Sequence, residues 1–218
     1  MRRHWLLGVL FVAAFAQAQL ESVKPQIDYF ARDTFRIESY VCPFKNEIDY
    51  EPGEIECGLL QVPENRETPD SRFIELHFVK LNSTWDDEDE DSEDDSDESP
   101  KPAPGKRDDA VIYLSGGPGA HATGYVKRFK DHRILHHRDM FILEQRGIAY
   151  SGDFCPKYYA RKPEIFDVDT FDGQQQASLT AAGDCAANAA AAGVDLSAYN
   201  TIENARDVHA FRMALDIE

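Results

Sequence analysis

Residues 111–126 read VIYLSGGPGAHATGYV, and this stretch decides which fold the sequence predicts. A short apolar strand leads directly into three glycines and one proline, Gly116 to Gly119. Glycine allows positive φ angles and lets a ligand approach the main chain closely, while proline fixes its own φ angle and removes one N–H donor. We therefore expect a rigid loop of exposed backbone at the carboxyl end of a strand, which is where open α/β sheets bind their ligands.

Three roles for this loop follow from its residues. A phosphate-binding loop has the pattern G-x-G-x-x-G or G-x-x-x-x-G-K-[ST], and the run from Gly116 to His121 matches neither. An oxyanion hole needs main-chain N–H groups that face an oxygen as it becomes negative, and a loop of exposed backbone supplies groups of this kind. A tight turn without chemistry is the third role, and the spacing alone leaves the last two open.

The segments around the loop predict an α/β domain. Residues 54–65 and 72–81 are strands joined by a polar turn with proline, which is typical of an antiparallel hairpin. Residues 109–117 and 138–147 contain apolar runs without alternation, which is typical of parallel strands covered on both faces. A helix between these two strands would complete a βαβ unit. Two later helices are expected, one over residues 183–193 and one capped by Asn200 that continues to residue 215.

Two segments are expected to lie outside the packed domain. Residues 1–18 combine two arginines, an apolar run and an A-x-A site, the organisation of a cleaved secretory signal peptide, with an uncleaved anchor as the alternative. Residues 82–109 form an acidic insertion without apolar periodicity, for which disorder is expected. Eleven acidic residues between 86 and 98 carry much of the net charge of −17. The remainder has no basic patch, which argues against a nucleic-acid partner.

An exported chain places its cysteines in an oxidising environment, where an even number predicts disulfides. Of the three possible pairings of four cysteines, we expect Cys42 with Cys57 and Cys155 with Cys185, because each pair closes a modest loop. A zinc site made of four cysteines is the alternative, and it usually needs pairs of the form C-x₂₋₄-C, which this sequence lacks.

Three motifs in order resemble the α/β-hydrolase family, and more narrowly its secreted serine peptidases of the proline iminopeptidase and tripeptidyl aminopeptidase type. These are YLSGGPG at 113–119, EQRGIAYS at 144–151 and NTIENARD at 200–207. The family pattern is a G-G-P-G loop, a D-Q-R-G-x-G-x-S turn and a helix that begins N-T-x-x-x-A-x-D. Glu144 stands in place of the usual Asp, and Ala149 in place of the second Gly of the turn. Arg146 is interpreted as a structural residue that ties this turn.

The resemblance implies the N-terminal portion of an α/β-hydrolase fold over residues 19–218, with an antiparallel hairpin followed by parallel βαβ units. It implies a serine aminopeptidase that releases N-terminal residues from peptides, with a peptide or small ester as substrate and no cofactor. The backbone N–H of Gly117 becomes the first candidate donor to the oxyanion, and that of Gly116 the second. Export implies a secreted or periplasmic location without stable membrane insertion.

The catalytic serine is not identified by the sequence. A G-x-S-x-G elbow would carry it, with an acid and a histidine further along the chain, and no such pattern occurs in the 218 residues. We therefore expect the chain to be the N-terminal part of a longer hydrolase and to be inactive alone, because an oxyanion hole without a triad gives only residual catalysis. Two alternatives remain open: a non-peptidase hydrolase such as an esterase or epoxide hydrolase, and a non-catalytic secreted binding protein. The residues leave the oligomeric state open.

Overall fold

The computed structural model describes residues 36–85, 105–117, 119–153, 155–156 and 162–217. The predicted signal peptide and residues 86–104 of the acidic insertion lie outside the described residues.

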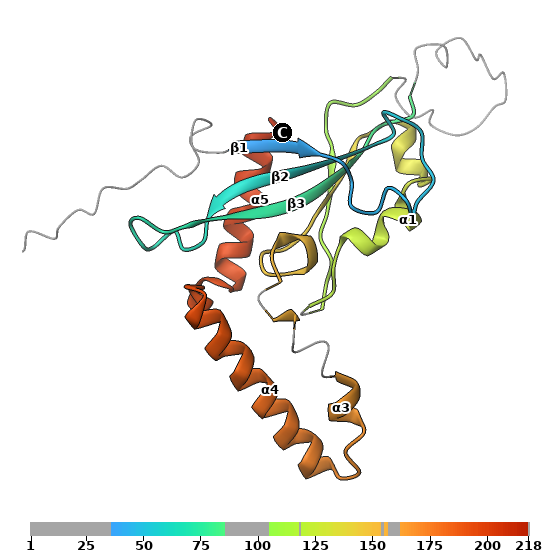
Figure 1. Ribbon diagram of the computed structural model, residues 1–218. Coiled ribbons are helices and arrows are strands. Elements are labelled where there is room, and N and C mark those ends of the chain that lie inside the picture. Colours follow the sequence, from blue (N-terminus) through green and yellow to red (C-terminus); the bar gives the residue numbers. More distant parts are fainter. Residues whose placement is uncertain (1–35, 86–104, 118, 154, 157–161, 218) are drawn as a thin grey trace, which may run out of the picture.

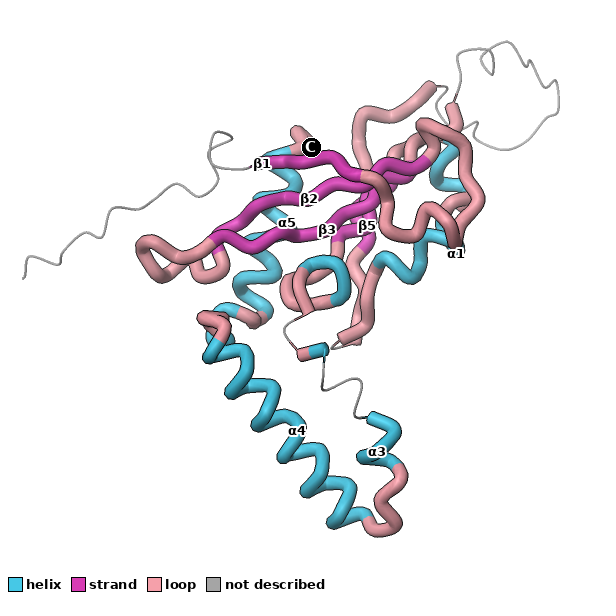
Figure 2. The backbone as a smooth tube through the Cα atoms, viewed as in Figure 1, coloured by secondary structure: helices cyan, strands magenta, loops and turns pink. Residues whose placement is uncertain are grey.

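A five-stranded sheet forms the body of the described chain (Figures 1 and 2). Its strand order is β1-β2-β3-β5-β4, so β4 lies at one edge and β1 at the other. The strands are β1 (Arg36–Tyr40), β2 (Ile55–Pro63), β3 (Phe73–Leu81), β4 (Val111–Tyr113) and β5 (Met140–Leu143).

The predicted hairpin is confirmed. Strands β2 and β3 pair antiparallel over their whole length, with Leu60 opposite Leu76. Both residues are fully buried, because the apolar face of the hairpin is covered. Strand β1, which the sequence pattern did not predict, adds to the outer edge of β2 and is also antiparallel.

The structure contradicts the predicted fold class of an α/β-hydrolase with successive parallel βαβ units. Among the described residues, three of the four strand pairs are antiparallel and only β4 with β5 is parallel. Strand β5 lies between antiparallel β3, where Phe78 faces Leu143, and parallel β4, where Tyr113 faces Ile142. An apolar run shows that both faces of a strand are covered, but it does not report the direction of its neighbours. The described fold is a small mixed sheet, mostly antiparallel, with few helices.

The connection between β4 and β5 is also less regular than predicted. In place of one helix it holds two 3₁₀ turns and a single helical turn: η3 (Thr123–Tyr125), α1 (Val126–Phe129) and η4 (Arg133–His136). The side chain of His132 accepts a hydrogen bond from the Ile134 amide and so begins a new turn at η4. Side chains that bond their own backbone in this way compete with a continuous helix.

The C-terminal helices begin at side-chain caps. Helix α4 (Phe171–Ala191) starts after Thr170 and is much longer than the predicted 183–193, although it ends before Gly193 as expected. Helix α5 (Thr201–Ala214) begins after Asn200, whose side chain accepts from the Glu203 amide, which confirms the predicted cap. The described residues also form the shorter elements η5 (Ala149–Ser151), α3 (Lys162–Phe166) and η6 (Leu196–Ala198).

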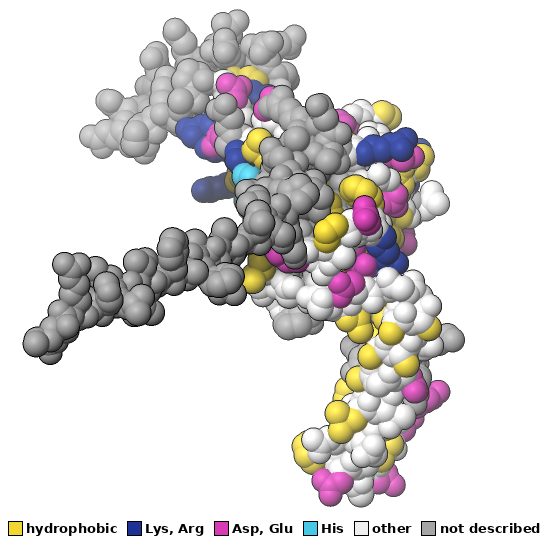
Figure 3. All heavy atoms as spheres, turned by 90° about the vertical axis from the view of Figure 1, so that its left-hand side faces the viewer, with side chains coloured by type: hydrophobic (Ala, Val, Ile, Leu, Met, Phe, Trp, Pro, Cys, Tyr) yellow, Lys and Arg dark blue, Asp and Glu magenta, His cyan; other side chains and the backbone are white. Residues whose placement is uncertain are grey.

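The sheet has a core on each face. Helix α5 covers one face (Figure 1). On that face the ring of Phe211 makes edge contacts with Phe78 and Phe141. The opposite core includes Val79 and Ile142 and is covered by the β4–β5 connection. Helices α3 and α4 extend away from the sheet as an arm that exposes apolar side chains, among them Phe166, Phe171 and Leu179 (Figure 3).

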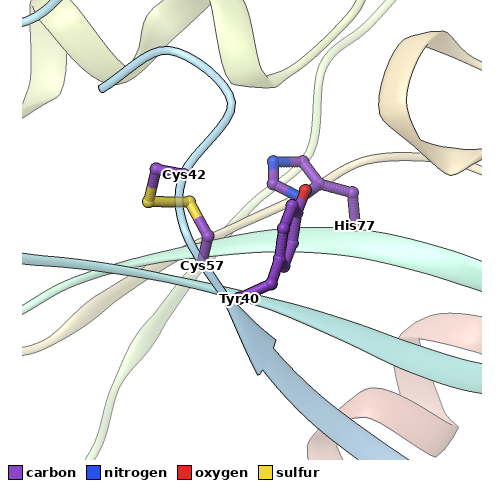
Figure 4. The surroundings of a disulfide bond; sticks show 4 residues. All are labelled: Tyr40, Cys42, Cys57 and His77. Atoms are coloured by element: carbon purple, nitrogen blue, oxygen red, sulfur yellow. A yellow bond between two sulfur atoms is a disulfide. The ribbon is translucent and has the colours of Figure 1, made fainter. Parts of the chain in front are cut away.

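Both predicted disulfides form. Cys42 pairs with Cys57 beside Tyr40 and His77 (Figure 4), and Cys155 pairs with Cys185 of α4. These pairs are consistent with an oxidising environment. Over the ranges that the structure describes, no helix has the length and apolar character to cross a membrane.

Candidate functional site

The glycine loop begins at the carboxyl end of β4, and its backbone is exposed. Gly117 has a φ angle of 77° and Gly119 one of 87°, conformations that favour glycine. Gly116 and Gly117 are exposed, and a side chain on either would extend into open space. Pro118 lies outside the described residues.

The amide and carbonyl groups of the loop have different partners. The carbonyl of Gly117 accepts a hydrogen bond from the Ala120 amide at 3.1 Å, which closes a tight turn. No described residue accepts a hydrogen bond from the main-chain N–H of Gly116 or Gly117. Among the described residues, the turn therefore uses the carbonyl of Gly117 and neither of these two N–H groups.

Glu144, directly after β5, contacts the far end of the loop. It is only 1% exposed. Its carboxylate accepts hydrogen bonds from the amides of Ala122 and Thr123, at 2.7 and 3.1 Å, and from the Thr123 hydroxyl at 2.7 Å. Three donors satisfy a buried charge that would otherwise be costly.

The near end of the loop is held less tightly. The side-chain amide of Gln145 donates to the carbonyl of Ser115 at 3.4 Å. Ser115 is buried, and its hydroxyl has no hydrogen-bond partner among the described residues. A cavity of about 240 Å³ adjoins this end, lined by Leu114, Glu144 and Gln145 together with residues from the first half of α5.

Arg146 has a structural role, as interpreted from the sequence. Its side chain is fully buried and donates to both carboxylate oxygens of Asp207 at 2.7 Å. It also donates to the carbonyls of Ala198 and Glu64. The guanidinium therefore joins the turn after β5 to α5 and to the end of β2, and it is not available to a ligand.

His77 of β3 is the buried histidine of the described sheet. Its Nδ1 lies 2.6 Å from the hydroxyl of Tyr40, and its ring makes an edge contact with Tyr150. Burial lowers the pKa of His77 to about 4, so the ring is neutral at pH 7. Sequence reasoning gave this residue no role, because a single histidine in an apolar strand carries no motif.

The described residues bring no serine hydroxyl against the rings of His77, His121 or His132, which contact Tyr40 or backbone amides instead. Ser151 is engaged elsewhere: its hydroxyl accepts from the His77 amide and donates to the Glu144 carbonyl. None of these three rings is therefore paired with a serine hydroxyl among the described residues.

A larger cleft of about 1000 Å³ lies between the start of β3, the turn after β5 and α4. Tyr150 and Asp153 from the turn and Asn188 from α4 line it. The turn after β5 thus contributes Glu144 and Gln145 to the smaller cavity at the glycine loop and Tyr150 and Asp153 to this cleft.

No protein-family model matches the chain, and comparison with curated proteins found no match. The likeness to serine peptidases therefore rests on the three motifs quoted above.

Proposed function

We propose that this chain is part of an exported serine hydrolase, an aminopeptidase of prolyl or tripeptidyl type. Its glycine loop binds the carbonyl oxygen of the scissile bond through the main-chain N–H groups of Gly117 and Gly116. The observation that carries this proposal is that no described residue accepts a hydrogen bond from these two amides, and that a side chain added at either glycine would meet no described atom within 4 Å. Both disulfides support a location outside the cytoplasm.

The chemistry explains why such a loop has glycines. Attack on a carbonyl carbon moves negative charge onto its oxygen, and fixed N–H donors at that position stabilise the transition state more than the ground state. A backbone without side chains lets the substrate reach these donors. Removing one donor of this kind lowers kcat by about 10²–10³-fold. The nucleophile, the acid and the histidine are not assigned to residues of this chain.

The proposal is tested with the protein produced from its natural reading frame. Rates are measured on prolyl and tripeptidyl chromogenic amides and on simple esters, for the wild type and for Gly117→Val. The Val side chain strains a φ of 77° and extends into the open space beside the exposed backbone, so we expect kcat to fall by about 10²-fold. Gly193→Val is the matched control, because Gly193 has a φ of 74° and also faces open space, but lies at the end of α4.

The outcomes separate the alternatives. Faster turnover of esters than of amides would identify a non-peptidase hydrolase. Absence of turnover, together with no labelling by a fluorophosphonate that modifies activated serines, would identify a binding protein. Equal losses in Gly117→Val and Gly193→Val would show that the loop acts only through stability.

A further inference from the structure

Two neighbouring side chains at the end of β5 hold opposite ends of the glycine loop. The Gln145 side chain contacts the Ser115 carbonyl, directly before the glycines. The Glu144 carboxylate contacts the amides of Ala122 and Thr123, shortly after them. Both ends of the loop are thus held by side chains that directly follow β5. Between these ends, the hydrogen bond from the Ala120 amide to the Gly117 carbonyl is the one formed within the loop by the described residues.

Glu144 is itself held in place. Its amide donates to the His77 carbonyl at 2.9 Å and its carbonyl accepts from the Ser151 hydroxyl at 3.1 Å. The backbone of Glu144 therefore belongs to the rigid centre of the sheet, next to β3. Through its hydrogen bonds to Ala122 and Thr123, its side chain restricts the motion of the glycine loop, whose backbone would otherwise be free to adopt many conformations.

We propose that Glu144 is a positioning residue that keeps the amides of Gly116 and Gly117 oriented for binding an oxygen. Its effect on catalysis rests on the proposed function, whereas its effect on the order of the loop does not. Donors stabilise a developing charge only when they are oriented in advance, because reorientation during the reaction would consume the gain. A carboxylate is suited to this task, since it accepts from all three donors of Ala122 and Thr123 at once.

The variant Glu144→Gln tests the proposal with little change of shape. It replaces one acceptor oxygen by an NH₂ group, which faces N–H donors and cannot accept from them. We expect the NMR order parameters of the Gly116 and Gly117 amides to fall from about 0.85 to below about 0.6. Glu144→Asp keeps the carboxylate and is expected to restore part of the order.

Glu203→Gln is the matched control. Glu203 is a buried carboxylate, 3% exposed, that pairs with Arg66 at 2.6 Å and lies on α5. Loss of this carboxylate is expected to lower the free energy of unfolding and to leave the order parameters of the Gly116 and Gly117 amides unchanged. Unchanged order in Glu144→Gln, or an equal loss in both variants, would overturn the positioning role.

Kinetics of the protein from the natural reading frame give the second readout. We expect Glu144→Gln to lower kcat by about 10–100-fold with KM within about 2-fold, because misplaced donors weaken the transition state more than substrate binding. If Gly117→Val loses activity and Glu144→Gln keeps it, the positioning role fails alone. If the wild type turns over no substrate, the proposed function fails, and the order parameters still decide the role of Glu144.

Discussion

At the scale of single residues, His77 couples stability to pH. The folded protein lowers the pKa of its ring to about 4, from an ordinary value of 6.5, because the ring is buried. Between these values the unfolded chain binds more protons than the folded one, so stability falls as the pH is lowered from 6.5 to 4 and levels off below. The loss amounts to about 3 kcal/mol.

Urea unfolding at pH 7, 5.5 and 4 measures this loss. The variant His77→Leu has no titrating ring at this position. The free energy of unfolding of the wild type minus that of the variant should therefore decrease as the pH falls. A difference that stays constant across this range would show that His77 is not held neutral in the folded state.

Ala149 stores backbone strain. It lies in the turn after β5 with a φ angle of 42°, which disfavours any side chain. We expect Ala149→Gly to raise the free energy of unfolding by about 1 kcal/mol. Ala186→Gly in the interior of α4 should lower it by about 1 kcal/mol, and thermal unfolding of both variants checks the opposite signs. Destabilisation by both would refute the strain.

Ala149 and Glu144 differ in how far their structural roles could be predicted from the sequence. The strain at Ala149 follows from a motif in which glycine usually stands at that position. The contacts of Glu144 do not, because its partners Ala122 and Thr123 precede it by 22 and 21 residues and are brought to it only by the folded sheet. The candidate amides of Gly116 and Gly117 follow from the resemblance of the G-G-P-G motif to a known family, whereas the residues that hold the loop follow from tertiary structure.

At the scale of elements, buried charges join α5 to the sheet. Arg146→Met would remove the partner of both Asp207 oxygens and leave Asp207 its ion pair with Arg66 at 2.8 Å. Removing one side of a buried ion pair costs about 3–5 kcal/mol, and we expect the remaining pair to keep the loss near the lower figure. The double variant Arg146→Met with Asp207→Leu should recover part of this loss. Arg138→Ala is the control, because Arg138 is 23% exposed and its partner Asp109 is 55% exposed. It should cost at most about 1 kcal/mol.

Chemical denaturation of the wild type and of these three variants measures the energetic coupling between Arg146 and Asp207. A double variant less stable than Arg146→Met would mean that Asp207 contributes independently of the guanidinium.

Elements whose own residues carry a recognisable sequence pattern were predicted. Elements that depend on contacts with distant parts of the chain were not. The β2–β3 hairpin followed from alternation, and the start of α5 followed from Asn200, a cap three residues from its partner amide. The expected helix before β5 is broken, because His132 bonds its own backbone. Strand β1 depends on the edge of β2, which no pattern within residues 36–40 reports.

At the scale of the whole molecule, the same limit explains the wrong fold class. Apolar runs reported correctly that β5 is covered on both faces, but whether its neighbours are parallel or antiparallel depends on the path of the chain. The order β1-β2-β3-β5-β4 puts an antiparallel strand on one side of β5 and a parallel one on the other. The disulfide pairing was predicted because loop closure depends mainly on separation along the chain.

The Cys42–Cys57 disulfide joins the chain after β1 to β2, with a separation of 15 residues. In the chain-entropy description a loop of this length contributes about 3 kcal/mol. Replacing both cysteines by alanine should lower the free energy of unfolding by about that amount, as measured by urea titration under oxidising conditions. An unchanged stability would show that the β1 edge is held by its ladder alone.

The central claim is that the amides of Gly116 and Gly117 bind an oxygen that carries negative charge. The most direct measurement is the ¹H shift of these two amides by NMR, for the protein from its natural reading frame, as a peptide boronic acid saturates it. We predict that both resonances move downfield while the amide of Gly193 stays in place. Saturation by the boronic acid with Gly116 and Gly117 unmoved would contradict the account.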